Sequence, residues 1–223
     1  MRSFQKRGFE IFEEIFDEQE CKAILSDLHP SVRMNAPGYR SLLGGRFVES
    51  IAWDARLIKM AEGLLSGTAV PYKAILFDKS HNANWLVPWH QDRVLPIRNR
   101  FVDPEWGPWT AKGGVNFAHA PTWAMNRIVA FRIHLDNSEA HNGPLRVIPG
   151  SHLHGVLDQR EVVELSKKSD FEICTVRKGG VLAMRPLLIH ASSKSTSQMP
   201  RRVLHIEYAD SLRLADGIEL SLS

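Results

Sequence analysis

The sequence predicts a mainly β protein, a barrel or sandwich of short strands with helices buttressing one side. Two observations predict this class: Gly- and Pro-rich turns separate many short apolar runs, and helical periodicity is strongest near the N-terminus. The 223 residues, 43% hydrophobic and 24% charged, suffice for one domain with a sizeable core. We expect a single domain over residues 1–223, because no repeat or linker interrupts the sequence.

Capping and periodic signals predict three helices. Asp17 and Glu20 have the spacing of a capping box, and apolar residues follow them at helical intervals. A second amphipathic pattern follows Asp54, and a third, more polar one covers about 158–168. We expect the helices within about 17–65 to buttress the barrel.

Strand signals cover most of the remaining chain, with turn residues between several of the runs. The predicted strands span 74–77, 128–135, 145–148, 171–176, 181–184 and 203–208. The stretch 95–126 is different, because it contains four prolines, three glycines and three tryptophans. A long loop inside a domain is either disordered or functional, and its tryptophans favour an ordered active-site lid.

Composition excludes several classes of protein. A net charge of +3 is too small for a nucleic-acid footprint, and no apolar run is long enough to span a membrane. Residues 1–14 are too charged for a signal peptide. Cys21 and Cys174 stand alone, so we expect reduced thiols and a cytoplasmic protein. Nothing in the sequence indicates an oligomeric state.

The clearest chemical signal is the segment 89–92, Trp-His-Gln-Asp. In a strand, His90 and Asp92 project from one face, roughly 7 Å apart at the backbone, while Gln91 faces away. An imidazole and a carboxylate suit a divalent metal, and a second histidine would complete the 2-His-1-carboxylate set of non-haem Fe(II) sites. The alternative is a surface histidine that happens to lie near a surface aspartate.

His190 is the best candidate for the third ligand. It ends an apolar run, so packing of a buried segment would position its imidazole. Arg201 follows eleven residues later, where its planar guanidinium can reach back and bind a carboxylate through two hydrogen bonds. The alternative for Arg201 is a solvated strand end.

Together these elements resemble the phytanoyl-CoA dioxygenase family of Fe(II)- and 2-oxoglutarate-dependent oxygenases. The resemblance spans roughly 73–210 and depends on residues 87–92, on 142–155, and on 180–190 followed by Arg201. It implies a double-stranded β-helix, a jelly roll open at one end. It also implies a hydroxylase that uses Fe(II), 2-oxoglutarate and O2, releases succinate and CO2, and is stimulated by ascorbate.

The resemblance also implies roles for individual residues. His90, Asp92 and His190 match the iron ligands. Arg201 and Ser192 match the groups that hold the distal carboxylate of 2-oxoglutarate.

Three other positions relate to the cosubstrate or the substrate. Gln91 matches a residue close to the cosubstrate in the family, although strand alternation has it facing away. Arg132 stands where the acyl-CoA-hydroxylating member has an aromatic residue, and His134 shares its strand face. Either Arg132 contacts the cosubstrate and His134 the substrate at the barrel mouth, or both form the solvent face of an edge strand.

Four further residues are candidate substrate contacts, each with a simpler alternative. Trp89 either walls the pocket or fills the core, and Lys79 either faces an acid group or is solvated. His119 and Trp123 either close over the substrate or lie idle in the predicted lid.

We therefore predict a cytoplasmic dioxygenase that hydroxylates a small, anionic organic molecule. Arg93, Arg98 and Arg100 favour an anionic substrate if they surround the mouth. One alternative is a cupin-type metal-dependent hydrolase or isomerase, which predicts no role for Arg201. The other is a non-catalytic binding protein on the same barrel.

Overall fold

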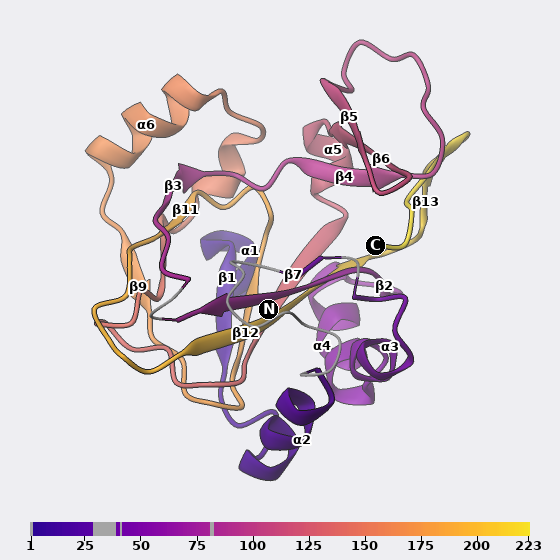
Figure 1. The fold of residues 1–223 in the computed structure, drawn as a ribbon. Coiled ribbons are helices and arrows are strands. Elements are labelled where there is room, and N and C mark those ends of the chain that lie inside the picture. The colour runs from indigo at the N-terminus through magenta and orange to yellow at the C-terminus, as the bar shows by residue number, and fades with distance from the viewer. Residues whose placement is uncertain (1, 29–38, 41, 81–82) are drawn as a thin grey trace.

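The fold consists of two antiparallel β-sheets that face each other, with helices outside them (Figure 1). The computed structural model describes residues 2–28, 39–40, 42–80 and 83–223. The major sheet has the order β1 (Phe9–Phe12), β10 (Val181–Met184), β7 (Ile128–His134), β12 (Arg201–Ala209) and β2 (Val70–Lys79). The minor sheet has the order β3 (Val87–His90), β11 (His190–Ser192), β8 (Leu145–Val147) and β9 (Glu172–Cys174).

The chain crosses repeatedly from one sheet to the other. It passes from β2 to β3, from β7 to β8, from β9 to β10 and from β11 to β12, and each step changes sheet. All strand pairs are antiparallel. This connectivity is that of a jelly roll, the double-stranded β-helix that was predicted, with β1 added beside β10.

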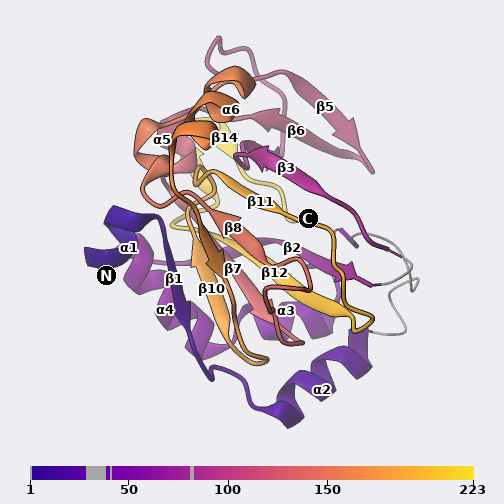
Figure 2. The same ribbon diagram turned by 90° about the vertical axis from the view of Figure 1, so that its left-hand side faces the viewer.

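The helices α2 (Glu18–Leu28), α3 (Arg46–Ala52) and α4 (Ala55–Leu65) cover the outer face of the major sheet. Figure 2 shows them below this sheet, with the minor sheet on its other side. Their apolar stripes pack on outward-facing side chains of the neighbouring strands β7, β12 and β2. These are Ala74, Leu76, Phe131, Ile133, Leu204 and Ile206.

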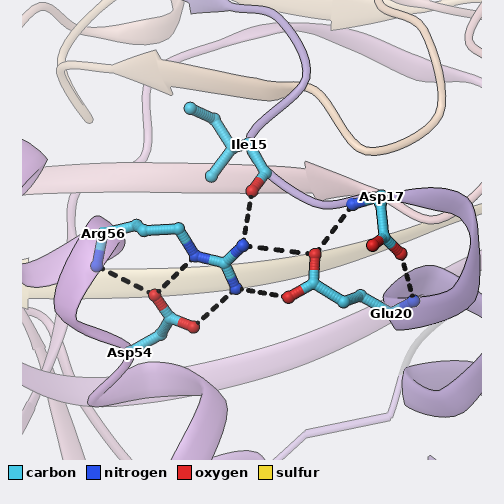
Figure 3. A network of polar contacts seen from close by, with 5 residues as sticks. All are labelled: Ile15, Asp17, Glu20, Asp54 and Arg56. Atoms are coloured by element: carbon cyan, nitrogen blue, oxygen red, sulfur yellow. Dashed lines mark hydrogen bonds and ion pairs between the residues drawn. The ribbon is translucent and has the colours of Figure 1, made fainter.

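A network of polar contacts joins the starts of α2 and α4 (Figure 3). Asp17 and Glu20 form the predicted capping box, in which each backbone amide donates to the other's carboxylate at 2.8 Å. The Arg56 guanidinium donates to Asp54, to Glu20 and to the carbonyl oxygen of Ile15. The network fixes how α4 is placed against α2, although its partly exposed ion pairs contribute little stability.

The stretch 95–126 is ordered by a small sheet of its own. Strands β4 (Val94–Ile97), β6 (Val115–His119) and β5 (Trp109–Lys112) pair in that order, and helix α5 (Thr122–Met125) follows. The ring of Phe101 packs edge-on against Trp106 and Trp109, with centroids 5.3 and 5.2 Å apart. Figure 1 shows this sheet above the barrel, beside the C-terminal hairpin of β13 (Arg213–Ala215) and β14 (Ile218–Glu219).

Differences from the predicted elements arise where pairing extends or shortens an apolar run. Strand β12 begins at Arg201 and β2 ends at Lys79, because these two charged residues pair directly across the strands. The run predicted at 171–176 is a strand only at β9. Helix α6 (Gln159–Lys168) forms as predicted, whereas α1 (Arg2–Arg7) and α3 were not predicted. No helix of the described residues is both long and apolar enough to cross a membrane.

Candidate metal centre

Pairing of β3 with β11 brings the three predicted ligands together. His90 is the last residue of β3 and lies directly opposite His190, the first residue of β11. The two imidazole centroids are 4.2 Å apart. Asp92 follows β3, and its backbone amide donates to the carbonyl oxygen of Pro186 at 2.9 Å, which fixes the turn. Residues a hundred positions apart therefore converge on one point.

The donor atoms have the spacing of a shared ion. One ligand atom from each of the three side chains lies within 4.8 Å of the other two. The Nε2 atoms of His90 and His190 are each 3.5 Å from an oxygen of Asp92. Ligands bound at right angles to one metal ion lie about 3 Å apart, so a small contraction suffices. The three residues fit a divalent cation such as Fe(II).

Backbone carbonyls select the tautomer that a metal requires. The Nδ1 atom of His90 is 2.9 Å from the carbonyl oxygen of Pro88. The Nδ1 atom of His190 is 2.8 Å from the carbonyl oxygen of Leu188. A carbonyl only accepts, so each Nδ1 carries the proton and each Nε2 presents a lone pair to the centre.

Burial and charge give the ligands their protonation states. Burial lowers the pKa of His190 to about 4, so its imidazole is neutral near pH 7. Burial alone would raise the pKa of Asp92, but His190 and His90 outweigh it and hold that pKa well below its usual value. Burial alone would lower the pKa of His90, but the Asp92 carboxylate outweighs it and raises that pKa. Metal binding requires both imidazoles to be neutral and the carboxylate to be ionised.

A cavity of about 710 Å³ lies between the two sheets and is lined by the three predicted ligands. Its size is that of a small-molecule site. The minor sheet, together with the segment that follows β3, contributes Val87, His90, Asp92, Leu145, His190 and Ser192. The major sheet contributes Lys73, Ile75, Phe77, Arg132, Arg201, His205 and Glu207. From the small sheet come Val94, Thr110, Lys112 and Phe117, with Gly113 from its β5–β6 turn.

One end of this cavity is built for an anion. Arg201 is 3% exposed, and its Nε donates to the carbonyl oxygen of Asn142 at 3.3 Å. Beside it, the Lys79 ammonium donates to Ser192 Oγ at 2.7 Å and to the carbonyl oxygen of Ser193 at 2.6 Å. Burial, with Arg132 nearby, lowers the pKa of Arg201 to about 9.

Lys79 is also affected by the charges around it. Burial, with Arg201 and Arg132 nearby, lowers its pKa to about 7. Within the described residues, no carboxylate forms an ion pair with Lys79 or Arg201. A ligand carboxylate would supply the missing negative charge.

Arg132 and His134 lie on β7, between β10 and β12 in the middle of the major sheet. The alternative of a solvent-exposed edge strand is therefore wrong. Arg132 lines the cavity, and its guanidinium lies 5.0 Å from the centre of the Phe77 ring. His134 is buried behind the cavity lining, and neither of its ring nitrogens has a hydrogen-bond partner among the described residues.

Sequence comparison identifies the family. A family model described as phytanoyl-CoA dioxygenase (PhyH) matches residues 4–203. The chain belongs to the phytanoyl-CoA dioxygenase family. This is the family of Fe(II)- and 2-oxoglutarate-dependent oxygenases that the motifs resemble, and the His-X-Asp…His triad is present.

One curated protein resembles part of the chain at modest identity. L-proline trans-4-hydroxylase of Streptomyces griseoviridis is 27% identical over 178 residues, which are 68% of this chain and 59% of that protein. The chain thus matches about three fifths of the length of that relative.

Solved structures show the same fold. AviO1 from Streptomyces viridochromogenes Tue57 has a TM-score of 0.69 and 22% identity, over 93% of this chain and 92% of its own. EctD from S. alaskensis, crystallised with 2-oxoglutarate and 5-hydroxyectoine, also has a TM-score of 0.69 and 22% identity. This match covers 93% of this chain and 74% of the EctD chain. These likenesses confirm the double-stranded β-helix.

Gln91 does not reach the cavity of this family member. Its amide nitrogen donates to the carbonyl oxygens of Gly155 and Leu187, both at 2.8 Å, and its side-chain oxygen accepts from the Leu157 amide at 2.9 Å. The cosubstrate contact implied by the resemblance is therefore absent from this geometry. Gln91 follows the last residue of β3, and these hydrogen bonds hold its side chain on the side away from the ligands, as strand alternation predicted.

Three other candidates also lie outside the cavity. Trp89 packs against Phe171, with centroids 5.8 Å apart, on the far side of the minor sheet. His119 and Trp123 line a separate surface groove. Trp123 also packs against Trp106, with centroids 5.9 Å apart. Strand alternation was the available signal for Trp89, because it points opposite to its neighbour His90. Local sequence did not indicate where His119 and Trp123 would lie relative to the cavity.

The three arginines after the ligand motif do not surround the mouth. Arg93 donates to the carbonyl oxygen of Leu157 at 2.8 Å, and Arg98 pairs with Glu219 at 2.5 Å. Arg100 lies beside Asn116 and Trp109. None of the three lines the cavity, so its positive charge comes from other residues.

Sequence reasoning missed a buried polar cluster in the cavity. Glu207 accepts from Lys73 at 2.7 Å, from His205 at 3.1 Å and from the Tyr72 hydroxyl. Burial alone would raise the pKa of Glu207, but Lys73 and the His205 hydrogen bond outweigh it and lower that pKa to about 2. Alternation along β12 was the available signal, because His205 and Glu207 share a strand face with Arg201.

Proposed function

We propose that the protein is an Fe(II)- and 2-oxoglutarate-dependent hydroxylase of a small anionic molecule. The observation that carries the proposal is the His90, Asp92 and His190 triad at one wall of a cavity whose far end holds buried, unpaired cations. When bound, iron, O2 and the keto acid supply the oxidation that replaces a substrate hydrogen with hydroxyl and releases succinate and CO2. Ascorbate would keep the iron ferrous.

The chain's own residues bind and orient the cosubstrate. Arg201 would bind the distal carboxylate through its planar guanidinium, which offers two parallel hydrogen bonds. The ammonium of Lys79 and the hydroxyl of Ser192 already contact each other beside it, so both can donate to the same carboxylate. With one end held, the keto-acid end would be fixed toward the triad, which removes orientational freedom before reaction.

The charge of the cavity supports an anionic substrate. Its lining has five cationic side chains, Arg40, Lys73, Lys112, Arg132 and Arg201, and the carboxylates Asp92 and Glu207. Glu207 is already bound to Lys73. The matched relative is named L-proline trans-4-hydroxylase, so free amino acids are the first molecules to test.

The small sheet would act as the lid over this substrate. Val94, Thr110, Lys112 and Phe117 from its strands line the cavity opposite the major sheet. A reducing compartment such as the cytoplasm agrees with the free thiols of Cys21 and Cys174.

Succinate formation tests the proposal. The protein is incubated with Fe(II), 2-oxoglutarate, O2 and ascorbate, and L-proline, other amino acids and simple carboxylic acids are screened as substrates. We expect substrate-dependent succinate release that Arg201→Met largely abolishes. Metal-dependent turnover of a substrate without consumption of 2-oxoglutarate, unchanged in Arg201→Met, would instead identify a cupin-type hydrolase or isomerase.

A further inference from the structure

Arg132 is a buried cation that has no anionic partner among the residues that the structure describes. It lies between His205 of β12 and Leu182 of β10, and its side chain is 8% exposed. Its Nε has no hydrogen-bond partner, and no carboxylate among the described residues pairs with its guanidinium. Burial lowers its pKa, yet an arginine stays protonated near pH 7. An unpaired buried charge is costly to a fold, so a ligand is the expected partner.

A second buried arginine shows what a structural role looks like in this fold. Arg185 is 9% exposed, nearly the same as Arg132. Its guanidinium donates to the carbonyl oxygens of Asn126, Ile128 and Leu64 and to the side chain of Gln5, at 3.0 to 3.3 Å. Arg185 does not line the cavity, whereas Arg132 does. The fold satisfies one guanidinium and leaves the other open toward the cavity.

The other buried charges of the cavity are already assigned. Lys73 is paired with Glu207 at 2.7 Å. If the proposed function holds, the distal carboxylate of 2-oxoglutarate occupies Arg201 and Lys79, and its other carboxylate lies at the metal. Among the described residues that line the cavity, Arg132 is then the remaining buried cation, and neither charge of the cosubstrate is left for it.

We propose that Arg132 forms a second anion site and binds a carboxylate of the substrate. This inference rests on the proposed function and narrows the substrate to a carboxylic acid. The planar guanidinium of Arg132 can form two parallel hydrogen bonds with a carboxylate. It lies over the Phe77 ring, 5.0 Å from the ring centre, in a cation–π contact. Because Arg132 lines the same cavity as the triad, the substrate acid group would be held at a fixed distance from the reacting carbon.

The test uses protein loaded with Mn(II), which binds similar ligands and relaxes nearby protons. Propionate is titrated into this protein with saturating 2-oxoglutarate, and NMR relaxation of its methyl protons reports binding near the ion. We expect saturable binding that propionamide, its neutral analogue, does not compete for. Arg132→Met should weaken propionate at least about tenfold and change the 2-oxoglutarate Kd by less than about threefold.

Two variants serve as controls. Arg98→Met removes an exposed cation that does not line the cavity and should change propionate affinity by less than about twofold. Arg132→Lys keeps the charge and should retain more affinity than Arg132→Met. Circular dichroism and thermal unfolding establish that each variant is folded.

Each contrary outcome has a distinct meaning. Unchanged propionate binding in folded Arg132→Met would overturn the proposal. So would loss of 2-oxoglutarate affinity in that variant without any propionate site in the parent, because Arg132 would then bind the cosubstrate. Failure of the parent to bind 2-oxoglutarate at all would contradict the proposed function, and propionate titration without 2-oxoglutarate would still test Arg132.

Discussion

The two faces of the major sheet have opposite compositions, although the same strands form both. On the outer face, Leu76, Phe131, Leu204 and Ile206 pack under the helices. On the inner face, the alternate positions of these strands are mostly charged or polar. They are Lys73, Lys79, Arg132, His134, Arg201, His205 and Glu207. Packing on the outer face stabilises the fold. The unpaired charges on the inner face destabilise it, and they are available to bind ligands.

The largest effect is expected at the metal centre on the inner side of the barrel. His90→Ala removes one of three ligands and should lower turnover by roughly 1,000-fold or more, with Mn(II) affinity reduced at least about tenfold. The melting temperature should stay close to that of the parent, because His90 is partly exposed and outside the apolar clusters. Electron paramagnetic resonance of free Mn(II) measures the affinity. Substantial turnover in this variant would remove His90 from the ligand set.

A substitution on the outer face should have the opposite profile. Leu204→Ala opens a cavity under the helices and should lower the free energy of unfolding by about 2–5 kcal/mol. Denaturant titration measures this loss, and the KM for 2-oxoglutarate should change by less than about twofold. A large change in the KM for 2-oxoglutarate, with an unchanged free energy of unfolding, would contradict the assignment of stability to the outer face and ligand binding to the inner face.

Arg201 and Arg202 provide a matched pair on adjacent positions of β12. Arg201→Met should raise the Kd for 2-oxoglutarate about 100-fold, since a charged, two-point hydrogen bond is lost. Arg202 points away and is bound to Asp136 at 2.7 and 2.8 Å, so Arg202→Met should change this Kd by less than about twofold. Calorimetry on the Mn(II) protein compares them. Equal effects of the two variants would mean that net charge, and not the Arg201 site, attracts the ligand.

The low pKa of Lys79 predicts a pH dependence of cosubstrate binding. Lys79 is protonated below its pKa of about 7 and neutral above it, and only the protonated form attracts a carboxylate. The Kd for 2-oxoglutarate should therefore rise about tenfold from pH 6 to pH 8, with proton uptake on binding. Lys79→Met should bind weakly at both pH values. A steep dependence that persists in Lys79→Met would assign the titration to another group.

The smallest expected effect is the change in the free energy of unfolding when Arg132 is replaced. Arg132→Met replaces an unpaired buried charge with an apolar side chain and should leave the free energy of unfolding unchanged or raise it by about 1 kcal/mol. Arg185→Met should lower it by about 1–3 kcal/mol, because buried carbonyl partners lose their donor. Denaturant titration of both variants without ligands checks this. A large loss in Arg132→Met would give Arg132 a structural role.

The sequence predicted the features that depend on local spacing. Alternation along a strand put His90 and Asp92 on one side and Gln91 on the other, and the structure has this arrangement. Capping signals located the starts of α2 and α4, and a polar helical pattern located α6, each within a residue or two. The apolar run that ends at His190 indicated the third ligand, and the resemblance to the family added the double-stranded β-helix.

Features that depend on strand register were not predictable in this way. Whether Arg132 is buried or exposed depends on the neighbours β10 and β12, which the sequence of β7 does not specify. Alternation puts Glu207 on the same strand face as Arg201, but its ion pair with Lys73 depends on the register of β12 against β2. Arg98 lies away from the mouth of the cavity, because it forms an ion pair with Glu219 of the C-terminal hairpin, which is distant in the sequence.

Absorption spectroscopy without oxygen examines the metal and the cosubstrate together. A 2-keto acid that chelates Fe(II) produces a visible charge-transfer band. The band should form saturably in the parent, require about 100-fold more 2-oxoglutarate in Arg201→Met, and be absent in His90→Ala. Parent protein that binds no Fe(II), or binds it without developing the band at any 2-oxoglutarate concentration, would contradict the assignment of this cavity.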